Sequence, residues 1–86
     1  MNPHSAKIVV TNDRKNSQVL YIEPWGEDYT LRASESMDIV AFGTAALPWF
    51  NIVESDRATQ IYIENCTDFV VYQNGEEVHC GHNRGR

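Results

Sequence analysis

The fold is decided by the stretch FVVYQNGEEVHC, residues 69–80, in which two runs of strand-forming residues flank an Asn-Gly pair. Asn74-Gly75 supplies the two positive φ angles that a two-residue type I′ turn requires, and β-branched and aromatic residues precede it. This stretch therefore predicts an antiparallel β-hairpin.

A two-residue turn also fixes which residues of the hairpin lie opposite each other. The expected pairs are Gln73–Glu76, Tyr72–Glu77, Val71–Val78, Val70–His79 and Phe69–Cys80. Because side chains alternate along a strand, Cys80 is expected on the apolar face with Phe69 and Val78, as a buried thiol. His79 is expected on the opposite, more polar face.

The same alternation of apolar runs and turn residues extends over the chain from Lys7 onwards. The strands that it predicts are 7–12, 18–23, 29–32, 37–42, 49–54, 58–64, 69–73 and 76–80. The unbroken apolar run within 18–23 indicates a strand buried on both faces.

Connections of two kinds link these strands. Residues 12–17 and 55–57 are expected to be hairpin connections, and residues 43–48 a crossover loop. No helical pattern lies between the seven or eight short strands. The sequence therefore predicts an all-β fold, a small antiparallel β-sandwich, with a partly open barrel as the alternative.

The length and the net charge of the chain limit the kinds of partner that can be expected. The 86 residues are expected to form one domain, 1–86, with a thin core. Seven Lys and Arg against twelve Asp and Glu give a net charge of -5, which repels phosphate backbones and anionic lipids. Nucleic acid and membrane are therefore not expected as partners.

Residues 1–7 lack the apolar segment of a secretory signal, and no apolar run reaches the roughly 20 residues of a membrane span. A cytoplasmic location is therefore expected. In that compartment Cys66 and Cys80 stay reduced, and a disulfide between them is the alternative in an oxidising compartment.

Residues 23–31 read Glu-Pro-Trp-Gly-Glu-Asp-Tyr-Thr-Leu and are followed by Glu35 and an apolar strand. This pattern resembles one in small bacterial all-β proteins whose function is uncharacterised. Residues 31–40 also resemble the strand-turn-strand unit of cupredoxin-like and immunoglobulin-like sandwiches, in which a Pro-Gly-Glu turn precedes a strand. Here Ala33-Ser34-Glu35 replaces that turn. The resemblances imply a sandwich and a bacterial source, and neither implies a function.

The first candidate site is the loop around Trp25. Trp25 and Tyr29 lie among Glu23, Glu27 and Asp28, so an exposed loop offers an aromatic face surrounded by carboxylates. Such a site suits a cationic side chain or an amine, because the face of the ring attracts positive charge. The alternative interpretation is that Trp25 folds back over the end of the sandwich and covers the thin core.

The second candidate site is the cluster of His79, Cys80 and His82, with Cys66 and His4 as further candidates. Cysteine and histidine are ligands of Zn²⁺ and copper, so a metal-binding or redox protein is one functional hypothesis, with zinc preferred to copper. The expected hairpin register opposes it, because His79 and Cys80 point to opposite faces.

No catalytic residue is assigned, because the sequence has no phosphate-binding glycine loop, Gly-x-Ser-x-Gly elbow or His-Glu-x-x-His pair. The leading hypothesis is a non-catalytic module, without a cofactor, that binds a protein partner or its own copies. Surface aromatic residues and edge strands serve such binding, and the candidates are Trp49, Tyr62 and Tyr72. A further hypothesis is a small-ligand or carbohydrate-binding module that uses Trp25 and Trp49.

Overall fold

The computed structural model describes residues 4–85 and contains eight β-strands and no helix in that part of the chain. The strands are β1 (His4–Thr11), β2 (Gln18–Glu23), β3 (Glu27–Leu31), β4 (Ser36–Gly43), β5 (Trp49–Glu54), β6 (Ala58–Glu64), β7 (Asp68–Gln73) and β8 (Glu76–Val78). The expected all-β fold is confirmed, and β2, β5 and β6 have the predicted bounds. None of residues 4–85 belongs to a helix long and apolar enough to cross a membrane.

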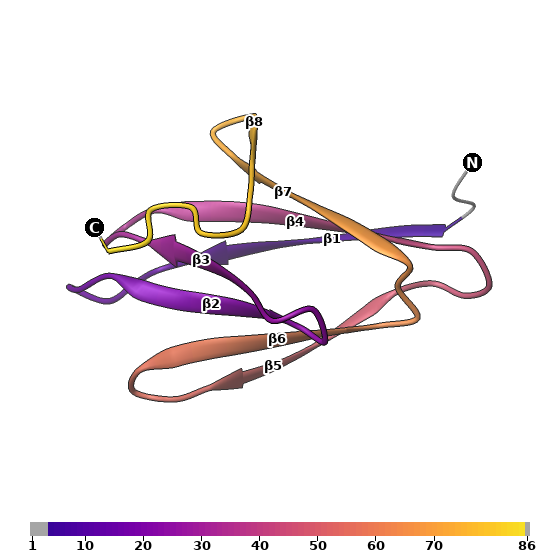
Figure 1. Cartoon of the computed structure of the whole chain (residues 1–86), viewed down its shortest axis with the longest axis horizontal. Helices are drawn as coiled ribbons and strands as arrows, with labels where there is room; N and C mark the ends of the chain where they lie inside the picture. Colours follow the sequence, from indigo (N-terminus) through magenta and orange to yellow (C-terminus); the bar gives the residue numbers. More distant parts are fainter. Residues whose placement is uncertain (1–3, 86) are drawn as a thin grey trace.

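The strands form two four-stranded sheets that pack face to face (Figure 1). Sheet A has the order β1-β4-β7-β8, and sheet B has the order β3-β2-β6-β5. Neighbouring strands are antiparallel except β2 and β6, which run parallel at the centre of sheet B. The expected sandwich is therefore confirmed, with one parallel pair that the sequence did not predict.

The connection at residues 12–17 is not the hairpin loop that the sequence predicted. β1 pairs with β4 and β2 pairs with β3, so this segment crosses from sheet A to sheet B. Asn12 holds the crossing: its buried Nδ2 donates to the carbonyl oxygens of Asn16 and Leu31, at 2.8 and 3.0 Å. Its Oδ1 accepts the amide of Arg14 at 3.0 Å. These hydrogen bonds satisfy a polar side chain inside the fold.

The crossover predicted at residues 43–48 is confirmed, because it joins β4 of sheet A to β5 of sheet B. Gly43 begins this loop and is buried. A Cβ atom at Gly43 would lie 2.5 Å from the carbonyl oxygens of Ala46 and Asn65. Glycine is therefore required where the loop approaches the β6–β7 connection. The hairpin predicted at 55–57 is also confirmed, because β5 and β6 pair antiparallel.

The core lies between the sheets and is built from the inward-facing residues of β2, β3, β4, β6 and β7. It comprises Leu20, Ile22, Tyr29, Leu31, Met37, Ile39, Ala41, Ile61, Ile63 and Val71. β2 is not buried on both faces as expected: Leu20 is 0% exposed, whereas Tyr21 is 38% exposed. The outer face of sheet B is open to solvent, so only alternate residues of this apolar run enter the core.

The β7–β8 hairpin has the predicted turn. Asn74 and Gly75 have φ angles of 54° and 79°, and the pairs Val71–Val78, Tyr72–Glu77 and Gln73–Glu76 form as expected. The two further expected pairs, Val70–His79 and Phe69–Cys80, do not form, because β8 ends at Val78.

Beyond Val78 the chain leaves sheet A and runs beside β3, as the yellow segment of Figure 1 shows. The amide of Gly81 donates to the carbonyl of Asp28 at 2.7 Å, and the amide of Thr30 donates to the carbonyl of His82 at 2.9 Å. We call residues 79–85 the C-terminal segment. Its change of direction leaves Cys80 exposed, which corrects the expectation of a buried thiol.

Candidate functional site

Trp25 lies in the β2–β3 turn, which closes with a hydrogen bond from the amide of Gly26 to the carbonyl of Ile22 at 2.9 Å. The indole packs against the ring of Phe69 on β7, with the ring centres 4.8 Å apart and the planes tilted by 55°. Trp25 nevertheless keeps 41% of its surface exposed. It therefore covers one end of the core and still presents ring surface to solvent, which combines both interpretations of this residue.

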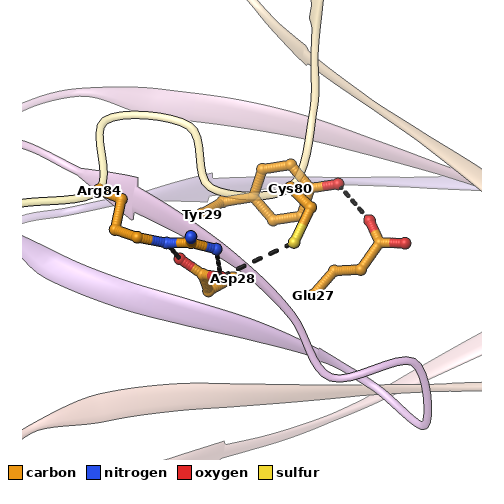
Figure 2. Close-up of polar contacts among 5 residues, drawn as sticks. All are labelled: Glu27, Asp28, Tyr29, Cys80 and Arg84. Carbon is orange, nitrogen blue, oxygen red and sulfur yellow. Dashed lines mark hydrogen bonds and ion pairs between the residues drawn. The ribbon is translucent and has the colours of Figure 1, made fainter.

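Side chains alternate along β3, so Glu27 and Tyr29 lie on one face of the strand and Asp28 lies on the other. The hydroxyl of buried Tyr29 donates to Oε1 of Glu27 at 2.7 Å (Figure 2). Burial, and then the carboxylate of Glu27, raise the pKa of Tyr29 well above its usual value. The phenol therefore stays protonated and holds the carboxylate of Glu27 in a fixed position as an acceptor.

A cavity of about 210 Å³ opens between β3 and the β7–β8 hairpin. We call it the Trp25 cavity; its aromatic walls are Trp25, Tyr29 and Phe69, its carboxylate walls are Glu27, Asp68 and Glu77, and His79 also lines it. Nδ1 of His79 lies 3.7 Å from Oε2 of Glu77. None of the lining residues is Lys or Arg. The cavity thus combines aromatic rings with three carboxylates and is suited to a positively charged group.

The charged residues around the end of the sandwich that carries the β2–β3 turn are acidic. The loops 24–26, 44–48 and 65–67 contain no charged residue, and the strand ends beside them carry Glu23, Glu27, Glu64 and Asp68. Basic residues of the described chain lie in the loops at the opposite end, at Arg14, Lys15, Arg32 and Arg57, and elsewhere at Lys7 and Arg84. The potential near the Trp25 cavity is therefore negative.

Asp28 was expected to belong to the Trp25 site, and the structure places it on the other side of β3. Its Oδ1 lies 2.6 Å from Nη2 of Arg84, and its Oδ2 accepts Nε of Arg84 at 3.1 Å (Figure 2). The hydrogen bonds from Arg84 lower the pKa of Asp28 below its usual value. Asp28 is therefore neutralised by the C-terminal segment and does not line the cavity.

The candidate metal ligands do not converge. His82 shares a hydrogen bond of 2.7 Å with Oε1 of Gln73, Cys80 lies 3.7 Å from Oδ1 of Asp28, and His79 faces Glu77. Within residues 4–85 no three His, Cys, Asp or Glu side chains are grouped so that they could hold a metal ion.

Cys66 lies apart from Cys80, and both thiols are free. Cys66 belongs to a second cavity of about 300 Å³, whose other walls are Thr44, Ala45, Ala46, Asn65 and Thr67. Burial raises the pKa of the Cys66 thiol. This cavity has no charged wall and its thiol stays protonated, so it offers neither charge recognition nor a reactive nucleophile.

Trp49 and Tyr62 lie on the outer face of sheet B, away from the Trp25 cavity. Tyr62 pairs with Asn51 of β5, and its neighbours Ile61 and Ile63 are buried on the inner face, as alternation predicted. Trp49 is 53% exposed and does not line the Trp25 cavity. Trp25 and Trp49, the two residues of the expected carbohydrate site, therefore do not line one cavity.

Sequence reasoning missed Asp68, Phe69 and Glu77 as members of the site. No local signal could have found them, because they lie on β7 and β8 of sheet A, far along the chain from the β2–β3 turn of sheet B. Only the packing of the two sheets brings them beside that turn. Comparison with models of protein families, with curated proteins and with solved structures finds no match for this chain. Its function is therefore inferred from its own residues.

Proposed function

We propose that this protein is a non-catalytic module that binds a protein partner. A cationic side chain of the partner enters the Trp25 cavity, and arginine is preferred to lysine. One observation carries this proposal: the rings of Trp25 and Phe69 and the carboxylates of Glu27, Asp68 and Glu77 line one cavity that has no Lys or Arg. A cation over an aromatic face gains about 0.5–2 kcal/mol, and nearby carboxylates add to it.

The size of the cavity supports a side chain as the ligand. Sites for whole small molecules usually measure about 300–1,000 Å³. The Trp25 cavity, at about 210 Å³, is smaller. A planar guanidinium can stack on an indole and pair with a carboxylate at the same time, which favours arginine. The rest of the partner then lies on the acidic surface around the cavity.

Preorganisation and steering also support the proposal. Tyr29 fixes Glu27 through a hydrogen bond of 2.7 Å, so little side-chain freedom is lost when a cation binds. The net charge of -5 attracts basic partners and accelerates their encounter with the protein.

The test is a nuclear magnetic resonance titration with the peptide acetyl-Gly-Arg-Gly-amide, followed at the indole N–H signals. The peptide is expected to shift the Trp25 signal with a dissociation constant on the order of 1 mM. The signal of Trp49 serves as an internal control and is expected to move little. The same peptide with citrulline, which is isosteric with arginine and uncharged, is expected to bind at least about tenfold more weakly.

Matched variants complete the test. The double variant Glu27→Gln, Glu77→Gln is expected to weaken binding of the arginine peptide at least about tenfold, whereas Glu64→Gln, on an exposed residue at the same end, is expected to leave it unchanged. Equal shifts from the arginine and citrulline peptides would contradict the proposal.

A further inference from the structure

β5 is the least protected edge of the sandwich. Within residues 4–85 it pairs only with β6, so its outer row of backbone N–H and C=O groups is free for another strand. The other edges carry features that discourage pairing. The C-terminal segment covers β3, β8 is three residues long and begins with two glutamates, and β1 has Lys7 near its middle.

Exposed apolar side chains gather on and beside this edge. Seven large apolar side chains of the described chain are exposed, and four of them, Leu47, Trp49, Ile52 and Val53, fall within residues 47–53. Ile52 belongs to the inner row, opposite fully buried Ile61, and is still 47% exposed. Sheet A therefore leaves the core partly uncovered beside β5, and another strand paired with β5 would cover these apolar side chains.

We propose that two copies of this chain associate through β5, paired antiparallel about a two-fold axis at Asn51. The two sheets B then form one continuous sheet of eight strands. This surface is separate from the Trp25 cavity, and the association does not depend on cation binding.

The sequence of β5 selects this register. With the axis at Asn51, Trp49 lies opposite Val53 of the second copy, and Phe50 opposite Ile52 of the second copy. With the axis at Ile52 instead, Asn51 lies opposite Val53 of the second copy, and Phe50 lies opposite Glu54 of the second copy. Only the first arrangement places apolar side chains against apolar ones and amide against amide, which is what stabilises neighbouring strands.

Charge favours a second copy as the occupant. Glu54 is the only charged residue of β5, and in this register it lies opposite Pro48 of the second copy. The two Glu54 carboxylates are then about six residues apart along the strands, roughly 20 Å, which exceeds the screening length in physiological salt. A charged foreign strand would find a single charged residue at the end of β5, whereas a second copy brings a largely apolar strand of matching pattern.

The first test is a cysteine cross-link that reports the register. In a Cys66→Ser, Cys80→Ser background, Asn51→Cys is expected to form a disulfide-linked dimer on mild oxidation, because self-opposed residues of antiparallel strands lie about 4.5–5.5 Å apart at Cα. Val53→Cys is the matched control on the same face. Two copies of residue 53 would lie roughly 13 Å apart, so no cross-link is expected. Cross-linking of Val53→Cys in place of Asn51→Cys would overturn the register.

The second test is sedimentation equilibrium of the unmodified chain and of two lysine variants. The unmodified chain is expected to be mainly dimeric at roughly 100 µM. Ile52→Lys is expected to raise the dissociation constant at least about tenfold, because a lysine on an edge discourages strand pairing. Val9→Lys, on the most exposed apolar residue of β1, is expected to change nothing.

Circular dichroism confirms that each variant is folded, and Val53→Lys replaces Ile52→Lys if the latter is not. A monomer at all concentrations, open-ended assemblies, or equal weakening by Val9→Lys would overturn the proposal.

Discussion

Asn12 is a short polar side chain that stabilises the fold from inside its thin core. It has no exposed surface, and its amide makes three hydrogen bonds where the chain passes from sheet A to sheet B. Its own backbone adds two more, from its amide to the carbonyl of Glu35 and from the amide of Ser34 to its carbonyl. A buried polar group is costly when its partners are removed, so this residue stabilises the crossing out of proportion to its size.

Asn12→Ala is expected to lower the free energy of unfolding by about 2–4 kcal/mol, because it removes three hydrogen bonds and leaves buried partners unsatisfied. Urea denaturation followed by tryptophan fluorescence measures the change. Asn16→Ala is the control, since Asn16 is exposed and contributes only its backbone carbonyl to this network. A loss of less than about 1 kcal/mol for Asn12→Ala would show that the network is not what holds the crossing.

This role could not be predicted from the sequence. Residues 12–17 are polar, and that composition fits a hairpin loop as well as a crossing between sheets. The difference depends on whether β1 pairs with β2 or with β4, and that choice is made by residues distant in the chain. In the candidate site, Trp25, Glu27 and Tyr29 could be placed together because they share one turn and one face of β3, whereas Phe69 and Glu77 could not.

Among the elements, the C-terminal segment is the one whose attachment depends on charge. It adds to the edge of β3 through few backbone hydrogen bonds, and the pair between Arg84 and Asp28 fastens its end (Figure 2). Hydrogen bonds from Arg84 lower the pKa of Asp28 below its ordinary value of 3.8. The stabilisation from this pair is therefore complete above that value and is lost as the pH falls through the lowered pKa.

Asp28→Asn is expected to loosen the C-terminal segment at neutral pH, because the amide cannot replace the charge that Arg84 requires. The amide protons of Thr30 and Gly81, both bonded between β3 and the segment, are expected to exchange with solvent about tenfold faster. Hydrogen exchange measured by nuclear magnetic resonance detects this change. Asp56→Asn, in the exposed β5–β6 turn, is the control. If the amide of Thr30 stayed equally protected from exchange, the backbone hydrogen bonds alone would be enough to hold the C-terminal segment against β3.

The bounds of the elements were predictable where local chemistry sets them. Pro24 ends β2 and Pro48 precedes β5, since proline cannot donate to a strand ladder, and Asn74-Gly75 sets its own turn. The course of the C-terminal segment was not predictable, because the hairpin register favoured continued pairing with β7. What ends that pairing is the edge of β3, which offers the carbonyl of Asp28 to the amide of Gly81.

At the scale of the whole molecule, the net charge of -5 acts differently on the two proposed associations. A cationic partner is attracted to the acidic end of the sandwich, whereas two copies of the chain repel each other over distance while β5 pairs by apolar contact. Salt screens both effects. The two associations should therefore respond to salt in opposite directions.

Between about 20 and 500 mM sodium chloride, the dissociation constant of the arginine peptide is expected to rise and that of the β5 dimer to fall. Titration of the peptide and sedimentation equilibrium of the chain measure the two constants in the same buffers. The citrulline peptide is the control and is expected to show little dependence on salt. Weakening of both associations by salt would indicate that charge pairs, and not apolar contact, hold the two copies together.

The parallel neighbours at the centre of sheet B also constrain the order of events when the chain is made. β2 gains β6 only once residues 58–64 exist, and β4 gains β7 only once residues 68–73 exist. A growing chain that has left the ribosome as far as residue 57 can form only marginal pairs such as β1 with β4 and β2 with β3. The two sheets therefore cannot be completed before residues 58–73 have left the ribosome, and the apolar residues of β5 emerge before β6, the strand with which they pair.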